Sequence, residues 1–279
     1  MYKKHFHKTT KAHVFNALMM CFLHMNQFAM CKSMDKYRFK AIKMNRAIGI
    51  LGGMGPQATV DAMNKIIKNT PAHRDQEHIP VITVSIPDIP DRSESIINKN
   101  DRPFKKMSEY LKILDNANVG CIIIPCNTAH FWFDQLQQCT NTKMISIIES
   151  VVNFIEGSHT EEVVILATSA TVSSQLYQHK FIEKKIKFNL PTSTIQQQIM
   201  QSIYTYKAGE IAESKKIMNQ VIQLYGLNPK KKFLLACTEI PLILEEWIKN
   251  YPDIFIDATD VLIQNAIYWY QHEKLKITH

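Results

Sequence analysis

The sequence predicts an α/β protein with two pseudo-symmetric lobes, each a mostly parallel sheet flanked by helices, and an active site in the cleft between them. From Ala47 onward, short apolar runs alternate with helical stretches, a pattern typical of βαβ units. The runs are almost continuously apolar, as parallel strands covered on both faces are. A coarse repeat of about 115 residues relates the two halves, which indicates a duplicated domain and not a solenoid. Such sheets bind ligands at the carboxyl ends of their strands, so we expect the site there.

Eight strands and four helices can be assigned to residue ranges. The strands are expected over Ala47–Leu51, Val81–Ile86, Cys121–Ile124, Lys143–Ile147, Val163–Ala167, Lys187–Leu190, Phe233–Ala236 and Ile254–Ile256. The helices with the clearest pattern are expected over Gln57–Asn69, Arg102–Asn116, Thr194–Lys207 and Glu210–Gly226. We expect residues 44–144 together with 250–279 to form the first lobe, and residues 145–249 to form the second.

Residues 1–43 differ in composition from the rest of the chain. They hold nine basic residues and one acidic residue, which accounts for the whole net charge of +8, whereas residues 44–279 hold 24 of each sign. No global basic field for nucleic acid is therefore expected in the folded part. The apolar run 14–30 is interrupted by polar residues and lacks a convincing cleavage site, which argues against a membrane span and a signal peptide. We expect a basic appendage outside the core, with Met44 as an alternative start.

Two of the six cysteines stand in matching sequence frames. Cys126 in CIIIPCNTAH and Cys237 in KFLLACTEIP each follow an apolar strand, precede a helix and have a threonine within two residues. The start of a helix stabilises a thiolate and lowers the pKa of a thiol. A buried inert thiol would explain either cysteine alone, but not the matched pair. We therefore predict two catalytic thiols, in a chain with free cysteines and a cytoplasmic location.

A glycine loop, Gly52–Ala58, follows the first strand. It fits the dinucleotide pattern G-x-G-x-x-A, but the acid expected at the end of the next strand is missing, so NAD binding is not favoured. The main chain around Met54, Gly55 and Gln57, at the positive end of a helix, is suited to an amino-acid carboxylate instead. Arg92, in a loop after the second strand, suits bidentate capture of a carboxylate.

A zinc site is not favoured. The spacing from Cys121 through Cys126 to His130 resembles half of one, but it spans a strand and its corner, and no second Cys/His pair has the usual spacing. We expect His130 to be structural or to support its neighbours, and Cys121 and Cys139 to be inert. We predict no metal.

These motifs together resemble the aspartate/glutamate racemase superfamily, and most closely its aspartate racemase branch. The resemblance covers residues 46–270 and is carried by IGILGGMGPQAT, the TPAHRDQEHIPV segment with IPDR, PCNTAH and ACTEIPL. Glutamate racemases carry Asp-Ser after the first strand and Cys-Thr-His in the second lobe, where this chain has Gly-Gly-Met and Cys-Thr-Glu. Decarboxylases of the superfamily keep only one of the two cysteines. The resemblance implies two α/β lobes, usually dimeric, with no pyridoxal phosphate and no metal, hence no cofactor.

The resemblance also implies which residues contact the substrate. It assigns substrate binding to Arg92, Asn127, Thr128, Ala129, Lys207, Thr238 and Glu239. The family helix carries Ile-Tyr, three further residues and then the lysine, whereas the segment before Lys207 is one residue shorter here. A one-residue deletion rotates a helical side chain by about 100°. Contact between Lys207 and the substrate is therefore left open.

The predicted reaction is the cofactor-independent interconversion of L- and D-aspartate, with glutamate and other amino acids left open. One thiolate removes the Cα proton while the opposite thiol delivers a proton to the other face. Two alternatives stay open: a single-cysteine enzyme such as a maleate-type isomerase, and a non-catalytic amino-acid-binding protein. We expect a small amino acid as ligand, a homodimer, and no nucleic-acid or membrane partner.

Overall fold

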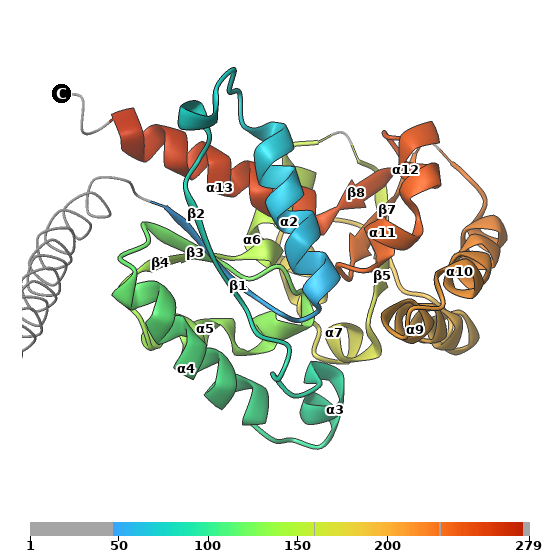
Figure 1. Cartoon of the computed structure of the whole chain (residues 1–279). Coiled ribbons are helices and arrows are strands. Elements are labelled where there is room, and N and C mark those ends of the chain that lie inside the picture. Colours follow the sequence, from blue (N-terminus) through green and yellow to red (C-terminus); the bar gives the residue numbers. More distant parts are fainter. Residues whose placement is uncertain (1–46, 159, 229, 276–279) are drawn as a thin grey trace, which may run out of the picture. The chain divides into compact units, whose positions relative to one another are not determined.

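Two four-stranded parallel sheets form the framework of the computed structural model (Figure 1). The structure describes residues 47–158, 160–228 and 230–275, so the predicted appendage with Cys21 and Cys31 lies outside the described residues. The first sheet has the order β2-β1-β3-β4, with β1 at Ile48–Gly52, β2 at Val81–Ser85, β3 at Cys121–Ile123 and β4 at Lys143–Ile145. The second has the order β6-β5-β7-β8, with β5 at Glu162–Ala167, β6 at Phe188–Asn189, β7 at Lys231–Ala236 and β8 at Phe255–Asp257.

Helices follow nearly every strand, as parallel pairing requires. In chain order they are α2 (Pro56–Asn69), α3 (Arg92–Ile97), α4 (Arg102–Asn116), α5 (Phe133–Gln138), α6 (Ile147–Glu156), α7 (Ser169–Ser173), α8 (Gln178–Glu183), α9 (Ser193–Lys207), α10 (Ile211–Tyr225), α11 (Ile240–Ile243), α12 (Glu245–Asn250) and α13 (Ala258–Leu275). Short 3₁₀ helices lie at Asp75–Glu77 and Thr128–Trp132. Among the described residues, no helix is long and apolar enough to cross a membrane.

The predicted α/β architecture is confirmed. All eight predicted strands form, each within two residues of its expected ends, and every strand pair is parallel. The second sheet repeats the strand order of the first, as the internal repeat predicts. Continuous apolar runs could locate these strands because both faces of each sheet are covered.

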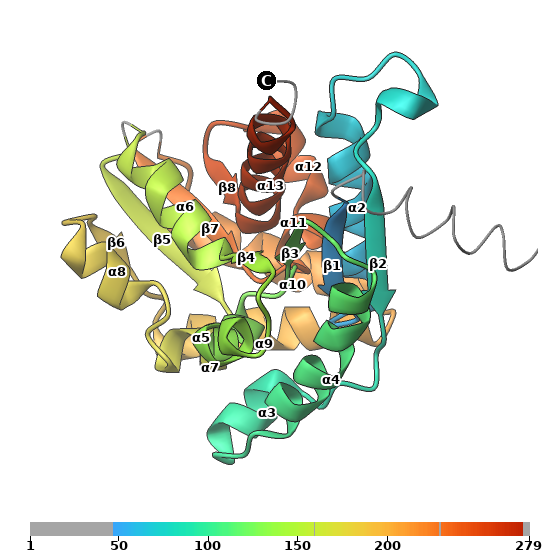
Figure 2. The ribbon, with the colours of Figure 1, turned by 90° about the vertical axis from the view of Figure 1, so that its left-hand side faces the viewer.

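The pairing of β8 corrects one part of the predicted lobe boundaries. Residues 250–279 were expected in the first lobe, but β8 pairs with β7 and completes the second sheet. A three-residue apolar run does not indicate which of two sheets it will join, because pairing is decided by tertiary contacts. Helix α13, which follows β8, packs against α2 and α6 and also contacts strands of both sheets. Figure 2 shows α13 between α6 and α2.

A shared apolar core joins the two sheets. One buried cluster contains Ile50 of β1, Ile165 of β5 and Leu262 of α13 together with residues of α6. The other face of the first sheet packs in a second cluster with Leu111 of α4, and the other face of the second sheet packs in a third cluster with Val221 of α10. Since close-packed interiors transmit displacement, the shared cluster fixes the two sheets relative to each other.

The glycine loop after β1 has a shape that requires glycine. Gly53 has a φ of +90°, and a Cβ atom there would collide with the main-chain oxygen of Ile86. The N–H of Gly53 donates to Oγ1 of Thr59 at 2.8 Å. This close approach brings the start of α2, with Pro56 at its first turn, against the end of β2.

Candidate active site

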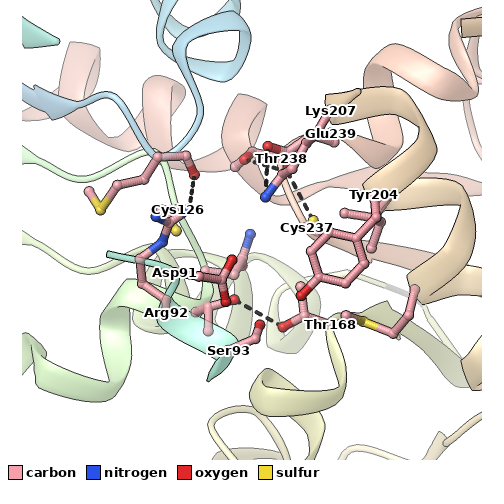
Figure 3. Close-up of a pocket in the computed structure, with 15 residues that line it drawn as sticks. Asp91, Arg92, Ser93, Cys126, Thr168, Tyr204, Lys207, Cys237, Thr238 and Glu239 are labelled. Carbon is pink, nitrogen blue, oxygen red and sulfur yellow. Dashed lines mark hydrogen bonds and ion pairs between the residues drawn. The ribbon is translucent and has the colours of Figure 1, made fainter. Parts of the chain in front are cut away.

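The carboxyl ends of strands from both sheets meet at a narrow, partly open cavity of about 20 Å³, which is room for one water molecule. Figure 3 shows Arg92 and Cys126 on one side of this cavity, and Cys237, Lys207 and Glu239 on the other. The lining residues are Met54, Asp91, Arg92, Ser93, Cys126, Asn127, Thr128, Thr168, Met200, Ile203, Tyr204, Lys207, Cys237, Thr238 and Glu239.

Most of the residues predicted from sequence come together here, and three do not line the cavity. Gly55 and Gln57 line a neighbouring, wider cavity of about 680 Å³, which shares Asp91, Arg92, Lys207 and Glu239 with the narrow one. The side chain of Ala129 is fully buried in the apolar core beside the first sheet. The two cavities together therefore contain every predicted site residue except Ala129.

The buried His130 ring stabilises the turn after β3 that contains Cys126. Its Nδ1 lies 2.8 Å from the main-chain oxygen of Cys126, and its Nε2 accepts a hydrogen bond from the N–H of Ile147 at 3.0 Å. Because Nε2 accepts, the ring proton resides on Nδ1, which donates to the Cys126 oxygen. Burial lowers the pKa of His130 to about 4, so the ring is neutral at pH 7. This geometry agrees with the structural role expected for His130.

We expect the free energy of unfolding to fall by about 3 kcal/mol between pH 7 and pH 4 through His130 alone. The pKa of His130 is lowered from 6.5 to about 4 in the folded protein. Below pH 6.5 the unfolded chain therefore binds a proton that the folded protein does not, and stability decreases until the pH reaches the folded pKa. Urea unfolding at a series of pH values measures the effect. The variant His130→Gln should lose this part of the pH dependence, whereas His179→Gln, at an exposed position, should keep it; equal pH dependence in both would contradict the prediction.

The two residues after the first thiol are buried and differ in what they offer a ligand. Asn127 accepts a hydrogen bond from the Tyr177 hydroxyl at its Oδ1, while its Nδ2 has no partner among the described residues. Oγ1 of Thr128 lies 2.9 Å from that of Thr168 and 3.1 Å from that of Thr171, and the latter two are 2.9 Å apart. Each hydroxyl has a single proton to donate, so this ring of three uses its protons internally. Of the Asn127 and Thr128 side chains, the one with a free hydrogen-bond donor is Asn127, through Nδ2.

Cys237 lies directly after β7 and is held by its neighbours. Its Sγ donates to Oε2 of Glu239 at 3.1 Å, and the Thr238 hydroxyl donates to the same oxygen at 3.4 Å. The other oxygen of Glu239 forms an ion pair with Lys207 at 3.4 Å. Burial raises the pKa of the Cys237 thiol well above its usual value, and the Glu239 carboxylate adds to this rise. The expectation that the helix start lowers the thiol pKa is therefore wrong for Cys237, because burial and the carboxylate outweigh a four-residue helix.

Arg92 is held in place by main-chain oxygens. It is the first residue of α3, and it donates to the carbonyls of Ile89, Pro90 and Met54 at 3.1, 3.2 and 3.3 Å. A guanidinium has five N–H donors, so two remain for a ligand. This arrangement fits the predicted capture of a carboxylate.

Lys207 reaches the cavity despite the shortened segment before it. It is the last residue of α9, and Nζ lies over the same cavity as both thiols. The one-residue deletion, which left the position of Lys207 open, therefore does not remove this residue from the lining of the cavity.

Six residues that line the cavity were not predicted as site residues from sequence: Asp91, Ser93, Thr168, Met200, Ile203 and Tyr204. Thr168 follows β5, the counterpart of β1 in the repeat, so the repeat could have indicated it. Tyr204 lies on α9, one turn before Lys207. Which face of that helix meets the first lobe is decided by tertiary packing, so no local pattern could indicate Tyr204. Among the described residues, no group of three or more His, Cys, Asp or Glu side chains could hold a metal ion.

The fold and the site define a two-lobed α/β protein in which each lobe contributes one thiol to a shared cavity. The chain belongs to the Asp/Glu/hydantoin racemase family, whose model matches residues 51–266. Aspartate racemase of Picrophilus torridus is 30% identical, aligns over 81% of this chain and 94% of its own, and superposes with a TM-score of 0.73.

Two further relatives bear on the comparison. The broad specificity amino-acid racemase RacX of Bacillus subtilis is 26% identical over 227 residues, which is 80% of this chain and 97% of that protein. Glutamate racemase of Francisella tularensis, solved in complex with D-glutamate, is 20% identical over 83% of both chains with a TM-score of 0.61, and shares the fold.

Proposed function

We propose that this protein is an amino-acid racemase that interconverts L- and D-aspartate by proton transfer at Cα between two thiols, without a cofactor. The observation that carries the proposal is that Cys126 and Cys237 come from different lobes and line one cavity. Inverting a carbon centre requires a proton to leave one face and another to arrive at the opposite face. Family membership and the likeness to an aspartate racemase support it.

The two thiols have different roles in each direction of the reaction. The raised pKa of Cys237 keeps it as a thiol that can deliver a proton, and the two-thiol scheme then assigns removal of the Cα proton to Cys126. As the Cα–H bond breaks, its electron pair moves into the carboxylate, which becomes an enediolate. Re-formation of a Cα–H bond takes the proton of the Cys237 thiol and leaves a thiolate there. The opposite enantiomer is converted with the two roles exchanged.

Charge that develops on the substrate needs fixed donors. The first lobe offers two kinds of donor for this charge. They are the two N–H groups of Arg92 that remain free and the Asn127 amide nitrogen. Donors that are already oriented stabilise the enediolate without reorganising during the reaction. Lys207 supplies a second cation, which suits the side-chain carboxylate of aspartate.

The narrow cavity must widen to admit an amino acid, because its volume of about 20 Å³ holds no more than one water molecule. The wider cavity beside it shares Arg92, Lys207 and Glu239, which supports access from that side. Closure after binding would exclude water and strengthen the polar contacts with the substrate.

A broader substrate range is the second candidate function. The narrow cavity is lined by two cations, Arg92 and Lys207, and by two carboxylates, Asp91 and Glu239, a balance that also suits a zwitterionic amino acid. The neighbouring cavity shares these charged residues and adds apolar side chains such as Ile89 and Ile211, with room for larger side chains. The broad specificity of the RacX relative supports this candidate.

The proposal is tested by incubating the full chain with L- and D-aspartate in D₂O and following Cα deuteration by NMR and enantiomer ratio by chiral chromatography. Racemisation in both directions, with deuterium in the newly formed enantiomer, is expected. Parallel incubations with glutamate and alanine distinguish aspartate specificity from the broad range. The double variant Cys126→Ser/Cys237→Ser is the inactive control. Exchange with a single enantiomer, without inversion, would contradict the two-thiol scheme, and no exchange with any amino acid would favour the non-catalytic binding protein.

We also propose a homodimer in the cytoplasm. The resemblance noted in the sequence implies the dimer, and the four unpaired thiols of the described residues support a reducing compartment. Light scattering should give twice the chain mass, and cell fractionation should recover the protein with cytoplasmic enzymes.

A further inference from the structure

A buried tyrosine from the second lobe contacts the amide beside the first thiol. Tyr177 lies at the start of α8 and is fully buried, and its hydroxyl donates to Oδ1 of Asn127 at 2.5 Å. The two residues are 50 positions apart in the chain and come from different lobes. Asn127 is 2% exposed and lines the cavity, whereas Tyr177 stands behind it.

This hydrogen bond sets the orientation of the amide. An asparagine presents an oxygen that accepts and an NH₂ group that donates, and the hydroxyl proton of Tyr177 fixes which of the two faces it. With Oδ1 held by Tyr177, Nδ2 is directed elsewhere, and it has no hydrogen-bond partner among the described residues. An unpaired buried donor is costly, and such groups in native proteins call for an explanation.

The reverse orientation is disfavoured by the surroundings of the tyrosine. Were the amide flipped, Nδ2 would donate to the hydroxyl of Tyr177, whose own proton would then need another acceptor. The ring of Tyr177 packs among apolar side chains, with the Phe181 ring at 5.8 Å. Burial also raises the pKa of Tyr177, so the hydroxyl keeps its proton and remains a donor.

We propose that Tyr177 is a positioning residue for catalysis: its hydroxyl holds the Asn127 amide so that Nδ2 donates to the substrate carboxylate beside Cys126. This inference rests on the proposed racemase function and names a part of the site that family likeness does not assign. A carboxylate oxygen would satisfy the free donor of Asn127 with a charge-assisted hydrogen bond. The same bond strengthens as the carboxylate becomes an enediolate, so the contribution appears in both KM and kcat.

The test is a double-mutant cycle in the full chain with Tyr177→Phe, Asn127→Ala and the combination, measuring kcat and KM with L- and D-aspartate. Tyr177→Phe keeps the ring and its packing and removes only the hydroxyl. We expect kcat/KM to fall about tenfold, the effect of one misplaced hydrogen-bond donor. In the Asn127→Ala background the same change should have no further effect, because Tyr177 acts through that amide. Additive losses, or unchanged kinetics in Tyr177→Phe, would overturn the inference.

A control and a second readout separate this inference from the proposed function. Tyr225→Phe removes a tyrosine hydroxyl outside both cavities and should leave kcat and KM unchanged. Thermal unfolding of each variant detects any loss of stability.

Calorimetric binding of aspartate, glutamate and alanine to Cys126→Ser/Cys237→Ser, with and without Tyr177→Phe, tests the positioning role without turnover. The same binding comparison is made with Asn127→Ala added to both variants. If the full chain does not racemise, but Tyr177→Phe weakens binding when Asn127 is present and has no effect when it is alanine, the inference stands and the racemase proposal fails. Binding unaffected by Tyr177→Phe, or no binding of any of the three, overturns the inference.

Discussion

Replacing either Cys126 or Cys237 by serine is expected to lower kcat for racemisation by about a hundred- to ten-thousandfold, the contribution of a positioned general acid or base. A serine hydroxyl is nearly isosteric with the thiol but ionises far less readily, so it can neither take nor supply the Cα proton efficiently. Chiral chromatography of L- and D-aspartate incubations measures the loss. Cys139→Ser is the matched control, since that thiol is free, exposed and outside the site, and it should retain full activity.

The residual exchange in the single-thiol variants distinguishes two thiols from one. Each variant keeps one group that can remove a Cα proton, and from one face only. In D₂O, Cys126→Ser should therefore exchange Cα of one enantiomer and Cys237→Ser that of the other. If one variant is fully active, or if both variants exchange the same enantiomer, the single-cysteine alternative replaces the two-thiol scheme.

Lys207→Met is expected to lower kcat/KM by about a hundredfold, within the range for truncating one partner of a buried charge pair. The ion pair joins Nζ of Lys207 to a Glu239 side chain that is only 4% exposed. Loss of the cation leaves this carboxylate unpaired next to the Cys237 thiol. It also removes the positive charge that opposes the rise of the Cys237 pKa, so that pKa should rise further.

The pH dependence of the reaction should report these changes in the pKa of Cys237. A higher pKa of Cys237 keeps the thiol protonated to higher pH, so the limb of the pH–rate profile that requires its thiolate should move to higher pH in Lys207→Met. Glu239→Gln removes the carboxylate that raises this pKa, and should move the same limb to lower pH. Lys216→Met is the matched control, because Lys216 forms an ion pair of the same length with Glu213 on the exposed face of α10. Shifts in the same direction for Lys207→Met and Glu239→Gln would contradict this account.

The strand and corner positions could be predicted because they are encoded locally. Apolar runs such as those ending before Cys126 and Cys237 form strands wherever the sheet is covered on both faces, and the residue after such a strand lies at its carboxyl end. The lobe of β8 could not be predicted in the same way. Its three residues are compatible with either sheet, and only the pairing with β7 decides between them.

Some residues of the site could be predicted from local sequence, and others depend on tertiary packing. Arg92, both thiols and the residues directly after them follow strands, so sequence position alone brings each to the carboxyl edge of its own sheet. The packing of the two sheets then brings the two edges to one cavity. The internal repeat could have been used to predict Thr168. It could not predict Tyr204, because the position of Tyr204 depends on which face of α9 packs against the first lobe.

The amino-acid sequence alone predicts the α/β architecture, the duplication and the pair of cysteines at equivalent strand ends. Tertiary structure sets the protonation of Cys237 and the hydrogen bonding beside Cys126. The raised pKa of Cys237 arises from burial and from Glu239, with Lys207 opposing the rise, and the amide orientation of Asn127 arises from a tyrosine 50 residues away. Strand formation depends on neighbours along the chain, whereas protonation and hydrogen-bond direction depend on groups brought together in space and on the water they exclude.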